Sequence, residues 1–210
     1  MNRPLLVLLP TALSACLAAC GSGTPTGSTT STAAAPSTSF GTATGTTTSS
    51  VATDVNPPGD IPDTQAFITT ADPQSRFNVK VPEGWARQDQ GTATTFSDHY
   101  NNIRLDTVAA TTAPTVDSAS SAEVPRITAT GAKVADVKVT ATQRTAGPVV
   151  LITYTADSAP NPVTGKVARE AVERYEFWRS GVEAIVTLAA PVGSDNVDPW
   201  RVVTNSFQWR

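Results

Sequence analysis

The chain has 210 residues and a formal net charge of −3 at pH 7; 40% of its residues are hydrophobic and 16% are charged. Nucleic-acid-binding domains present a basic face to the phosphate backbone, so this mild acidity argues against a nucleic-acid partner. The length and the hydrophobic content suffice for one sizeable core, and the sequence predicts one globular, monomeric domain.

The first 19 residues have the pattern of an export signal. A positively charged start, Met1–Arg3, precedes an apolar run from Pro4 to Ala15, which is the order found in secretory signals. The run is shorter than the roughly 20 residues that a permanent membrane-spanning helix needs. We therefore expect residues 1–19 to be removed on export.

Cys20 ends the stretch Leu17-Ala18-Ala19-Cys20, which resembles the lipobox of bacterial lipoproteins. The resemblance implies lipidation of Cys20 and cleavage before it. Two or more acyl chains, at about 0.8 kcal/mol per buried CH₂, hold a protein firmly on a bilayer. The predicted location is the extracytoplasmic face of the cell membrane, with the lipid on Cys20 as anchor. The alternative is conventional cleavage near Ala19, which would leave Cys20 as a free thiol.

Residues 20–58 are expected to form the lipidated cysteine and a disordered tether. Thr, Ser, Gly, Ala and Pro dominate this stretch, and Asp54 is its only charged residue up to Asn56. Such a composition cannot bury enough apolar surface to offset the entropy lost on ordering. The folded domain is then predicted to span residues 59–210. Because Cys16 lies in the signal, no disulfide is expected there.

The first half of the domain shows three strand-like segments. Phe77–Val81 alternates apolar and polar residues, and Ala93–Phe96 and Ile103–Ala110 follow with turn residues between them. Short alternating segments separated by turns indicate an antiparallel meander. The stretch before them, residues 60–76, is expected to be a loop with Phe67 packed on the core.

A helix is predicted over residues 117–130, capped by Asp117 or Ser118. Pro125 either kinks this helix or starts it. Two strands are expected next, Val134–Gln143 and the apolar run Val149–Tyr154, which should lie inside the sheet because both of its faces are apolar.

Residues 167–188 are predicted to form a β-hairpin, with Ser180-Gly181 as a two-residue turn. The turn sets the register, with Phe177/Ala184, Tyr175/Val186 and Glu173/Leu188 paired on one face and Trp178/Glu183, Glu176/Ile185 and Arg174/Thr187 on the other. The first face is expected in the core. The second is mixed, with an aromatic beside an aliphatic residue as a small apolar patch. The candidate binding surface consists of Trp178, Ile185, Arg174 and Glu176.

The C-terminal segment is predicted to be a short helix. Asp198 is expected as its cap with Pro199 in the first turn, and Asp195 is the alternative cap. Four apolar residues recur at helical spacing and should pack on the sheet, namely Val197, Trp200, Val203 and Phe207. The spacing of the aspartates does not form an EF-hand loop, so calcium is not expected.

The sequence predicts no catalytic residue, no metal and no cofactor. His99 is the only histidine, and neither a Gly-x-Ser-x-Gly turn nor a comparable setting for a nucleophile accompanies it, so the sequence does not support a Ser-His-Asp hydrolase. A zinc site needs three or four ligands of the His, Cys, Asp or Glu type. With one histidine and no free thiol in the folded domain, a zinc site is not expected. We expect His99 to be an exposed loop residue beside Asp98.

Four glutamates near the hairpin make a glycosidase with paired carboxylates the enzymatic alternative. They are Glu170, Glu173, Glu176 and Glu183. The predicted register separates Glu173 from Glu176 and Glu183, and Arg174 can neutralise the latter two. A solvated face of ion pairs is therefore the favoured interpretation.

Three stretches carry a resemblance to a known family: Phe77–Trp85, Arg174–Arg179 and Asp198–Trp209. In order and spacing they resemble actinobacterial exported lipoproteins with a PsbP-like domain, including the LpqN-type mycobacterial lipoproteins. The resemblance covers about residues 65–210. It implies an α+β fold in which an antiparallel sheet of about six to seven strands is flanked by helices, with the C-terminal helix packed on the sheet. It also implies an adaptor, assembly factor or ligand-binding module, and for LpqN-type proteins an association with cell-envelope lipids.

The expected function is that of a membrane-anchored extracytoplasmic lipoprotein, a non-enzymatic binding or scaffold module in cell-envelope assembly or in lipid or solute transport. Its partner would be an envelope or transporter protein or an amphiphilic ligand. Two alternatives stay open. One is a small-ligand-binding lipoprotein accessory to a transporter, and the other is an envelope hydrolase that uses His99 or the glutamates.

Overall fold

A computed structural model describes residues 59–161 and 163–210. The signal peptide, the lipidated Cys20 and the tether predicted for residues 1–58 lie outside the described residues. Among the residues that are described, no helix has the length and the apolar character needed to cross a bilayer.

The strands form two antiparallel sheets. The larger sheet has seven strands in the order β3-β4-β5-β9-β8-β7-β6, and the smaller has three in the order β1-β2-β10. The strands of the larger sheet are Ala86–Gln90 (β3), Ala93–Asp98 (β4), Asn101–Ala109 (β5), Ala135–Arg144 (β6), Gly147–Asp157 (β7), Arg169–Arg179 (β8) and Val182–Pro191 (β9). Those of the smaller sheet are Phe67–Ala71 (β1), Phe77–Pro82 (β2) and Gln208–Trp209 (β10).

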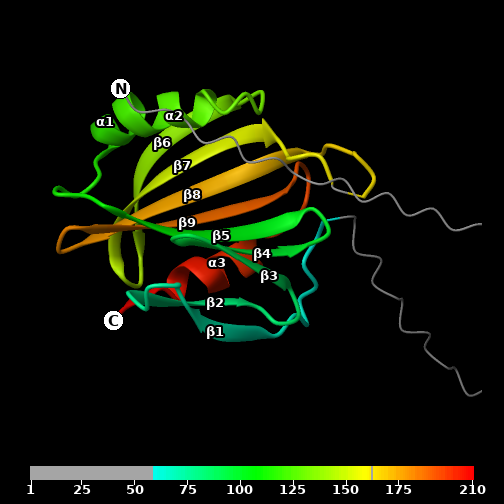
Figure 1. Cartoon of the computed structure of the whole chain (residues 1–210), viewed down its shortest axis with the longest axis horizontal. Helices are drawn as coiled ribbons and strands as arrows, with labels where there is room; N and C mark the ends of the chain where they lie inside the picture. The colour runs from blue at the N-terminus through cyan, green and yellow to red at the C-terminus, as the bar shows by residue number, and fades with distance from the viewer. Residues whose placement is uncertain (1–58, 162) are drawn as a thin grey trace, which may run out of the picture. The chain divides into compact units, whose positions relative to one another are not determined.

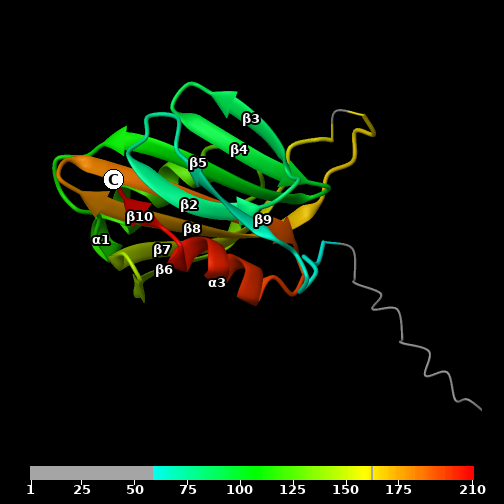
Figure 2. The same ribbon diagram turned by 90° about the horizontal axis from the view of Figure 1, so that it is seen from below.

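Helices lie on both faces of the larger sheet. Three short helices follow one another without a break, α1 (Val116–Ser118), the π-helix η1 (Ala119–Glu123) and α2 (Val124–Thr128). Together they form the helical cover, residues 116–128, which packs over β6 and β7 (Figure 1). Helix α3 (Val197–Asn205) lies beside β2 on the opposite face (Figure 2). The predicted fold class, an antiparallel sheet of about six to seven strands flanked by helices with the C-terminal helix packed on it, is confirmed.

The main core lies between the larger sheet and the layer made by the smaller sheet and α3. Phe207 stacks on Phe177 and on Phe77, with ring centroids 4.0 and 4.8 Å apart. Trp200 meets Trp85 edge-on, with a centroid distance of 6.4 Å. Aromatic rings dominate the energetics of such cores because each buries a large apolar area. Both tryptophans thus contribute to the core, and for Trp200 this packing is what the sequence predicts.

The β8–β9 hairpin has the predicted register. Phe177 pairs with Ala184 and Tyr175 with Val186 on the core face, and Arg179 faces Val182 across the turn. Ser180 and Gly181 form that turn and both have positive φ, at 49° and 84°, which is the backbone of a type I′ turn. A one-residue slip would bring Glu176 into the core, so the hydrophobic pattern specifies the register strongly.

The predicted three-strand meander is wrong in one respect, because β2 belongs to the smaller sheet. The turn after Pro82 carries the chain from one sheet to the other, with Glu83 N–H donating to Ala66 O at 2.8 Å. Strand β1 also falls within the predicted loop 60–76. Strand β3 was missed because every one of its side chains is exposed, and such an edge strand shows no alternation of apolar and polar residues.

The helical cover occupies the segment predicted as a helix and begins at Val116, so Pro125 does not start it. Pro125 lies in the first turn of α2, directly after the π-helix. The N–H of Val124 donates to Ala119 O, five residues back, so the chain widens to a π-turn just before the proline. The widened turn accommodates a residue that cannot donate a hydrogen bond. The cap is Thr115, not Asp117 or Ser118: its hydroxyl accepts from Ser118 N–H in a capping box.

Helix α3 begins after Asn196 rather than at an aspartate cap. The Asn196 side chain accepts from Ile61 N–H at 2.8 Å and donates to Gly59 O at 2.9 Å, which fixes the start of the domain to the helix. Asp198 forms an ion pair with Arg201 instead. Trp200, Val203 and Phe207 are buried as predicted, whereas Val197 is 60% exposed.

Candidate functional site

The four predicted binding-surface residues share one face of the hairpin, the face that points toward the helical cover. That face was expected to be solvated, and this expectation is wrong for two of them. Glu176 is 1% exposed and Ile185 is 6% exposed, while Arg174 and Trp178 are partly buried. The sequence pattern shows which residues share a face, but not that a helix fifty residues earlier in the chain covers it.

A cavity of about 380 Å³ lies at the end of the sheet where Trp178 stands. We call it the Trp178 cavity, and it is lined by Ala113, Pro114, Thr115, Val116, Ala141, Pro148, Val149, Val150, Glu176 and Trp178. Most of these side chains are apolar, and Glu176 is the only charged one. A volume of 300 Å³ or more with a few placed polar groups is typical of small-molecule sites.

A second hollow of about 320 Å³ adjoins the first, since Ala113, Pro114 and Glu176 line both. We call it the acidic recess. Three carboxylates line it: Glu123 from the helical cover, Glu176 from β8 and Glu183 from β9. Its rim is the loop from Ala109 to Pro114. The apolar Trp178 cavity and the acidic recess therefore lie next to each other.

Glu176 is held by an ion pair on one side only. Its Oε1 accepts from Arg174 Nε at 3.0 Å, whereas its Oε2 is buried and has no hydrogen-bond partner among the described residues. Burial raises the pKa of Glu176, and the guanidinium of Arg174 opposes that rise. A buried acceptor without a partner is unusual, because leaving one unsatisfied costs about 1–3 kcal/mol.

Arg174 links the strand to the helical cover. Its Nη2 lies 3.0 Å from Glu123 Oε2, and the other oxygen of Glu123 pairs with Arg126. Arg174 donates to Glu123 and Glu176 but forms no hydrogen bond or ion pair with Glu183 among the described residues, and only its charge acts on that carboxyl. Burial, followed by the charge of Glu176, raises the pKa of Glu183 to about 7.

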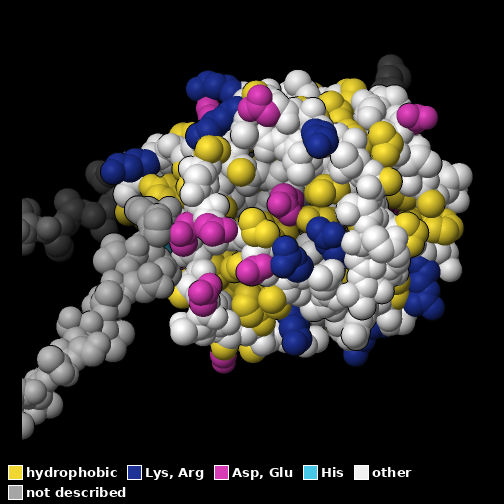
Figure 3. Space-filling view, turned by 180° about the vertical axis from the view of Figure 1, so that it is seen from behind, with side chains coloured by type: hydrophobic (Ala, Val, Ile, Leu, Met, Phe, Trp, Pro, Cys, Tyr) yellow, Lys and Arg dark blue, Asp and Glu magenta, His cyan; other side chains and the backbone are white. Residues whose placement is uncertain are grey.

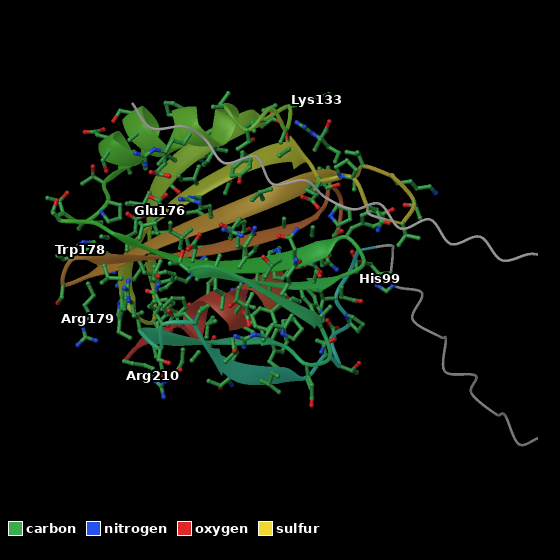
Figure 4. The ribbon with its side chains drawn as sticks, viewed as in Figure 1. His99, Lys133, Glu176, Trp178, Arg179 and Arg210 are labelled. Atoms are coloured by element: carbon green, nitrogen blue, oxygen red, sulfur yellow. The ribbon has the colours of Figure 1, made fainter. Side chains whose placement is uncertain are left out.

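Trp178 is fixed in place rather than free at the surface. Its indole N–H donates to Ala110 O at 2.8 Å, which ties the ring to the loop that rims the acidic recess. On the sheet it pairs with Glu183. Figure 4 shows Glu176 on β8 below the helical cover and Trp178 farther along the same strand. The indole therefore forms one wall of the Trp178 cavity and is held there by its hydrogen bond.

His99 lies far from this cavity, at the opposite end of the sheet (Figure 4). It stands in the turn between β4 and β5, its side chain is 81% exposed, and its Nδ1 is 3.0 Å from Asp98. The prediction of an exposed loop histidine beside an aspartate is confirmed. Among the described residues, no three His, Cys, Asp or Glu side chains are grouped to hold a metal.

The other two glutamates of the hairpin, Glu170 and Glu173, line neither the Trp178 cavity nor the acidic recess. Glu173 is on the other face, where its Oε2 accepts from the hydroxyl of Tyr175 at 2.7 Å, in agreement with the predicted register. Glu170 is 8% exposed and lines two hollows other than the Trp178 cavity and the acidic recess, and burial raises its pKa to about 7. The sequence interpretation missed Glu123, since only its place in the helix predicted for residues 117–130 could have indicated that it faces the sheet.

Comparisons with known proteins indicate the fold of this chain but not its family or its function. No family model and no curated protein sequence matches the chain. Among solved structures, the chain is similar to the Saccharomyces cerevisiae Ran-binding protein Mog1p, with 9% identity over 69% of this chain and 96% of that one and a TM-score of 0.50. A likeness at this identity shows a similar fold and nothing of function.

Two further structures were found at lower TM-scores. A Synechocystis PsbP (CyanoP) has 13% identity, covers 72% of this chain and 98% of that one, and has a TM-score of 0.49. A protein from Bacteroides thetaiotaomicron has 11% identity over 68% of this chain and a TM-score of 0.41, and the match spans 48% of that protein.

Proposed function

We propose that this protein is a lipid-anchored, extracytoplasmic binding module that holds a small amphiphilic ligand between its helical cover and its larger sheet. The site is the Trp178 cavity with the acidic recess beside it. The ligand would serve cell-envelope assembly or transport, and the module performs no chemistry on it.

The observation that carries the proposal is the carboxylate of Glu176 at the boundary of the two hollows. Its free Oε2 is buried without a partner, and both hollows include the residue in their walls. Folding alone gives no reason to place such a group there, because a buried acceptor without a donor is destabilising. A ligand that brings a donor into the hollow supplies the missing partner.

The sequence before residue 59 supports the anchor. The lipobox ending at Cys20 would place acyl chains on the mature N-terminus. The tether of residues 20–58 would then hold the domain on the order of 30–35 Å from the bilayer, as expected for a flexible coil of this length. A domain at that distance can collect a ligand from the membrane surface or deliver one to it.

The similar fold of Mog1p is consistent with a binding role, because that protein is a Ran-binding protein by name. His99 is exposed and remote from the cavity.

The test is to purify the lipidated full chain from membranes and to identify bound small molecules by mass spectrometry after solvent extraction. We expect an amphiphile in stoichiometric amount with the wild type and its loss from Trp178→Ala. The matched control is Trp209→Ala, which removes an indole on the other side of the sheet and should retain the ligand. Equal ligand in wild type and Trp178→Ala would rule out this cavity.

The anchor is tested separately with Cys20→Ser. This variant should leave the membrane fraction and appear in the soluble extracytoplasmic fraction, with an unmodified mass. If it partitions with membranes as fully as the wild type, the proposed lipid anchor is wrong, whatever the cavity binds.

A further inference from the structure

We infer that the ligand carries a protonated amine on an apolar body, with the ammonium group seated between Glu176 and Glu183 and the apolar part in the Trp178 cavity. The inference rests on the proposed function and deepens it by assigning the chemical class of the ligand.

The charges around the recess leave a place for a cation. Three carboxylates face it, and the one guanidinium among them, that of Arg174, already donates to Glu123 and to Glu176. Arg126 pairs with Glu123 from the solvent side and is 73% exposed. Glu183 forms no ion pair among the described residues. The recess therefore has more buried acid than base, and an anionic head group would be repelled from it.

The sheet register brings the carboxylates of Glu176 and Glu183 together. Glu176 pairs with Ile185, and Trp178 pairs with Glu183, so Glu176 and Glu183 are diagonal neighbours on adjacent strands and point to the same face. Such diagonal pairs lie about 7–8 Å apart at the backbone, within reach of long side chains. An ammonium group has three donors and no acceptor, so one group between the two carboxylates can bind the free Oε2 of Glu176 and a Glu183 oxygen.

The apolar part of the ligand has a defined direction. Trp178 neighbours Glu183 across β8 and β9, and Val150 neighbours Glu176 across β7 and β8. Both side chains line the Trp178 cavity, so an ammonium in the recess points its chain along the indole. On the space-filling face seen from behind, apolar side chains lie among charges of both signs and no single charge dominates (Figure 3). This contrasts with the local excess of acid in the recess.

Glu183 makes the binding depend on pH. Its pKa of about 7 results from burial, with Glu176 and Glu123 raising it and Arg174 and Arg126 lowering it. An ammonium ligand is bound by the ionised carboxylate, so its affinity should rise as the pH increases from 6 to 8. An alkylamine stays protonated over this range, since amine pKa values are about 10.

The experiment uses calorimetric titration of the full chain with octylamine, octanol and octanoate. At pH 8 we expect octylamine to bind at least roughly tenfold more tightly than octanol, because one charge-assisted hydrogen bond contributes about that much affinity. Octanoate should bind most weakly. Glu176→Gln and Glu183→Gln should each reduce the octylamine affinity toward that of octanol. Glu170→Gln, a buried carboxylate outside the recess, is the matched control and should leave it unchanged.

A second arm needs no change in Glu176, whose replacement could disturb folding. The octylamine affinity of the wild type should fall between pH 8 and pH 6, and Glu183→Gln should remove most of that fall. If octanol binds as tightly as octylamine, or if octylamine binding ignores both substitutions, the amine inference is overturned. In the first case the cavity still binds an apolar ligand and the proposed function stands, whereas binding of none of the three probes contradicts both.

Discussion

The guanidinium of Arg174 donates to Glu123 Oε2 at 3.0 Å and so joins strand β8 to the helical cover. The same guanidinium holds Glu176 Oε1 at 3.0 Å. The side chain of Glu176 is fully buried and that of Glu123 is 20% exposed, and Arg174 is the only ion-pair partner of Glu176 among the described residues.

Replacing Arg174 by alanine should therefore destabilise the domain strongly. Removing one partner of a buried pair leaves an uncompensated charge, which costs about 3–5 kcal/mol. Urea denaturation monitored by tryptophan fluorescence measures the loss. The control is Arg201→Ala, which breaks an exposed pair with Asp198 and should cost less than about 1 kcal/mol. Equal losses of unfolding free energy in the two variants would show that the Arg174 ion pairs stabilise the domain no more than the exposed Arg201–Asp198 pair does.

The free energy of unfolding should fall as the pH rises from 5 to 8. Burial raises the pKa of Glu170 and that of Glu183 to about 7, so the folded state keeps protons that the unfolded chain has already lost. Stability from this source is complete below the unfolded pKa of about 4.3 and is lost as the pH rises through 7. The expected fall is on the order of 1–3 kcal/mol, given about 1.4 kcal/mol per pKa unit and partial solvent screening.

Denaturation curves at pH 5, 6, 7 and 8 test this trend. The double variant Glu170→Gln, Glu183→Gln should have a flatter profile. The lowered pKa values of Asp89 and Asp157 act below their unfolded value of about 3.9 and do not mask the effect. Constant or rising stability between pH 5 and pH 8 in the wild type contradicts it.

Phe207 should be among the most costly residues to truncate. It is 1% exposed, and its ring lies parallel to that of Phe177, with 2° between the planes. Phe207→Ala should lower the free energy of unfolding by about 3–5 kcal/mol, the usual cost of removing a buried aromatic side chain. Val197→Ala, at a position 60% exposed, should change it by less than about 0.5 kcal/mol. Thermal or chemical denaturation measures the loss of unfolding free energy in both variants. A loss below about 1 kcal/mol for Phe207→Ala would contradict the described core.

The hairpin register could be predicted from sequence because the turn and the alternation act locally. Ser180-Gly181 determine which residues face each other, and the apolar positions determine which face enters the core. The fold class was predicted differently, because the resemblance of Phe77–Trp85, Arg174–Arg179 and Asp198–Trp209 to a known family implied it. The placement of β2 could not be predicted, since the choice of sheet depends on where the chain crosses after Pro82, and local patterns contain no such information.

The candidate site was predicted only in part. The sequence identifies Trp178 and Glu176 as residues of one mixed face, but burial of that face depends on the helical cover, whose contact with the sheet is a tertiary feature. Glu123 is 51 positions from Arg174, and nothing in the local pattern of either indicates that they meet. The free oxygen of Glu176 could be recognised only when all of its neighbours were known.

Photolabelling tests the ligand site most directly. The full chain is irradiated with a long-chain alkylamine that carries a diazirine in its chain, digested and sequenced by mass spectrometry, with and without excess octylamine. Labels should appear on the walls of the Trp178 cavity, above all within residues 148–150 and at Trp178, and octylamine should suppress them. Labels on the other side of the sheet, for instance at Trp209, or labels that excess octylamine does not reduce would contradict the account.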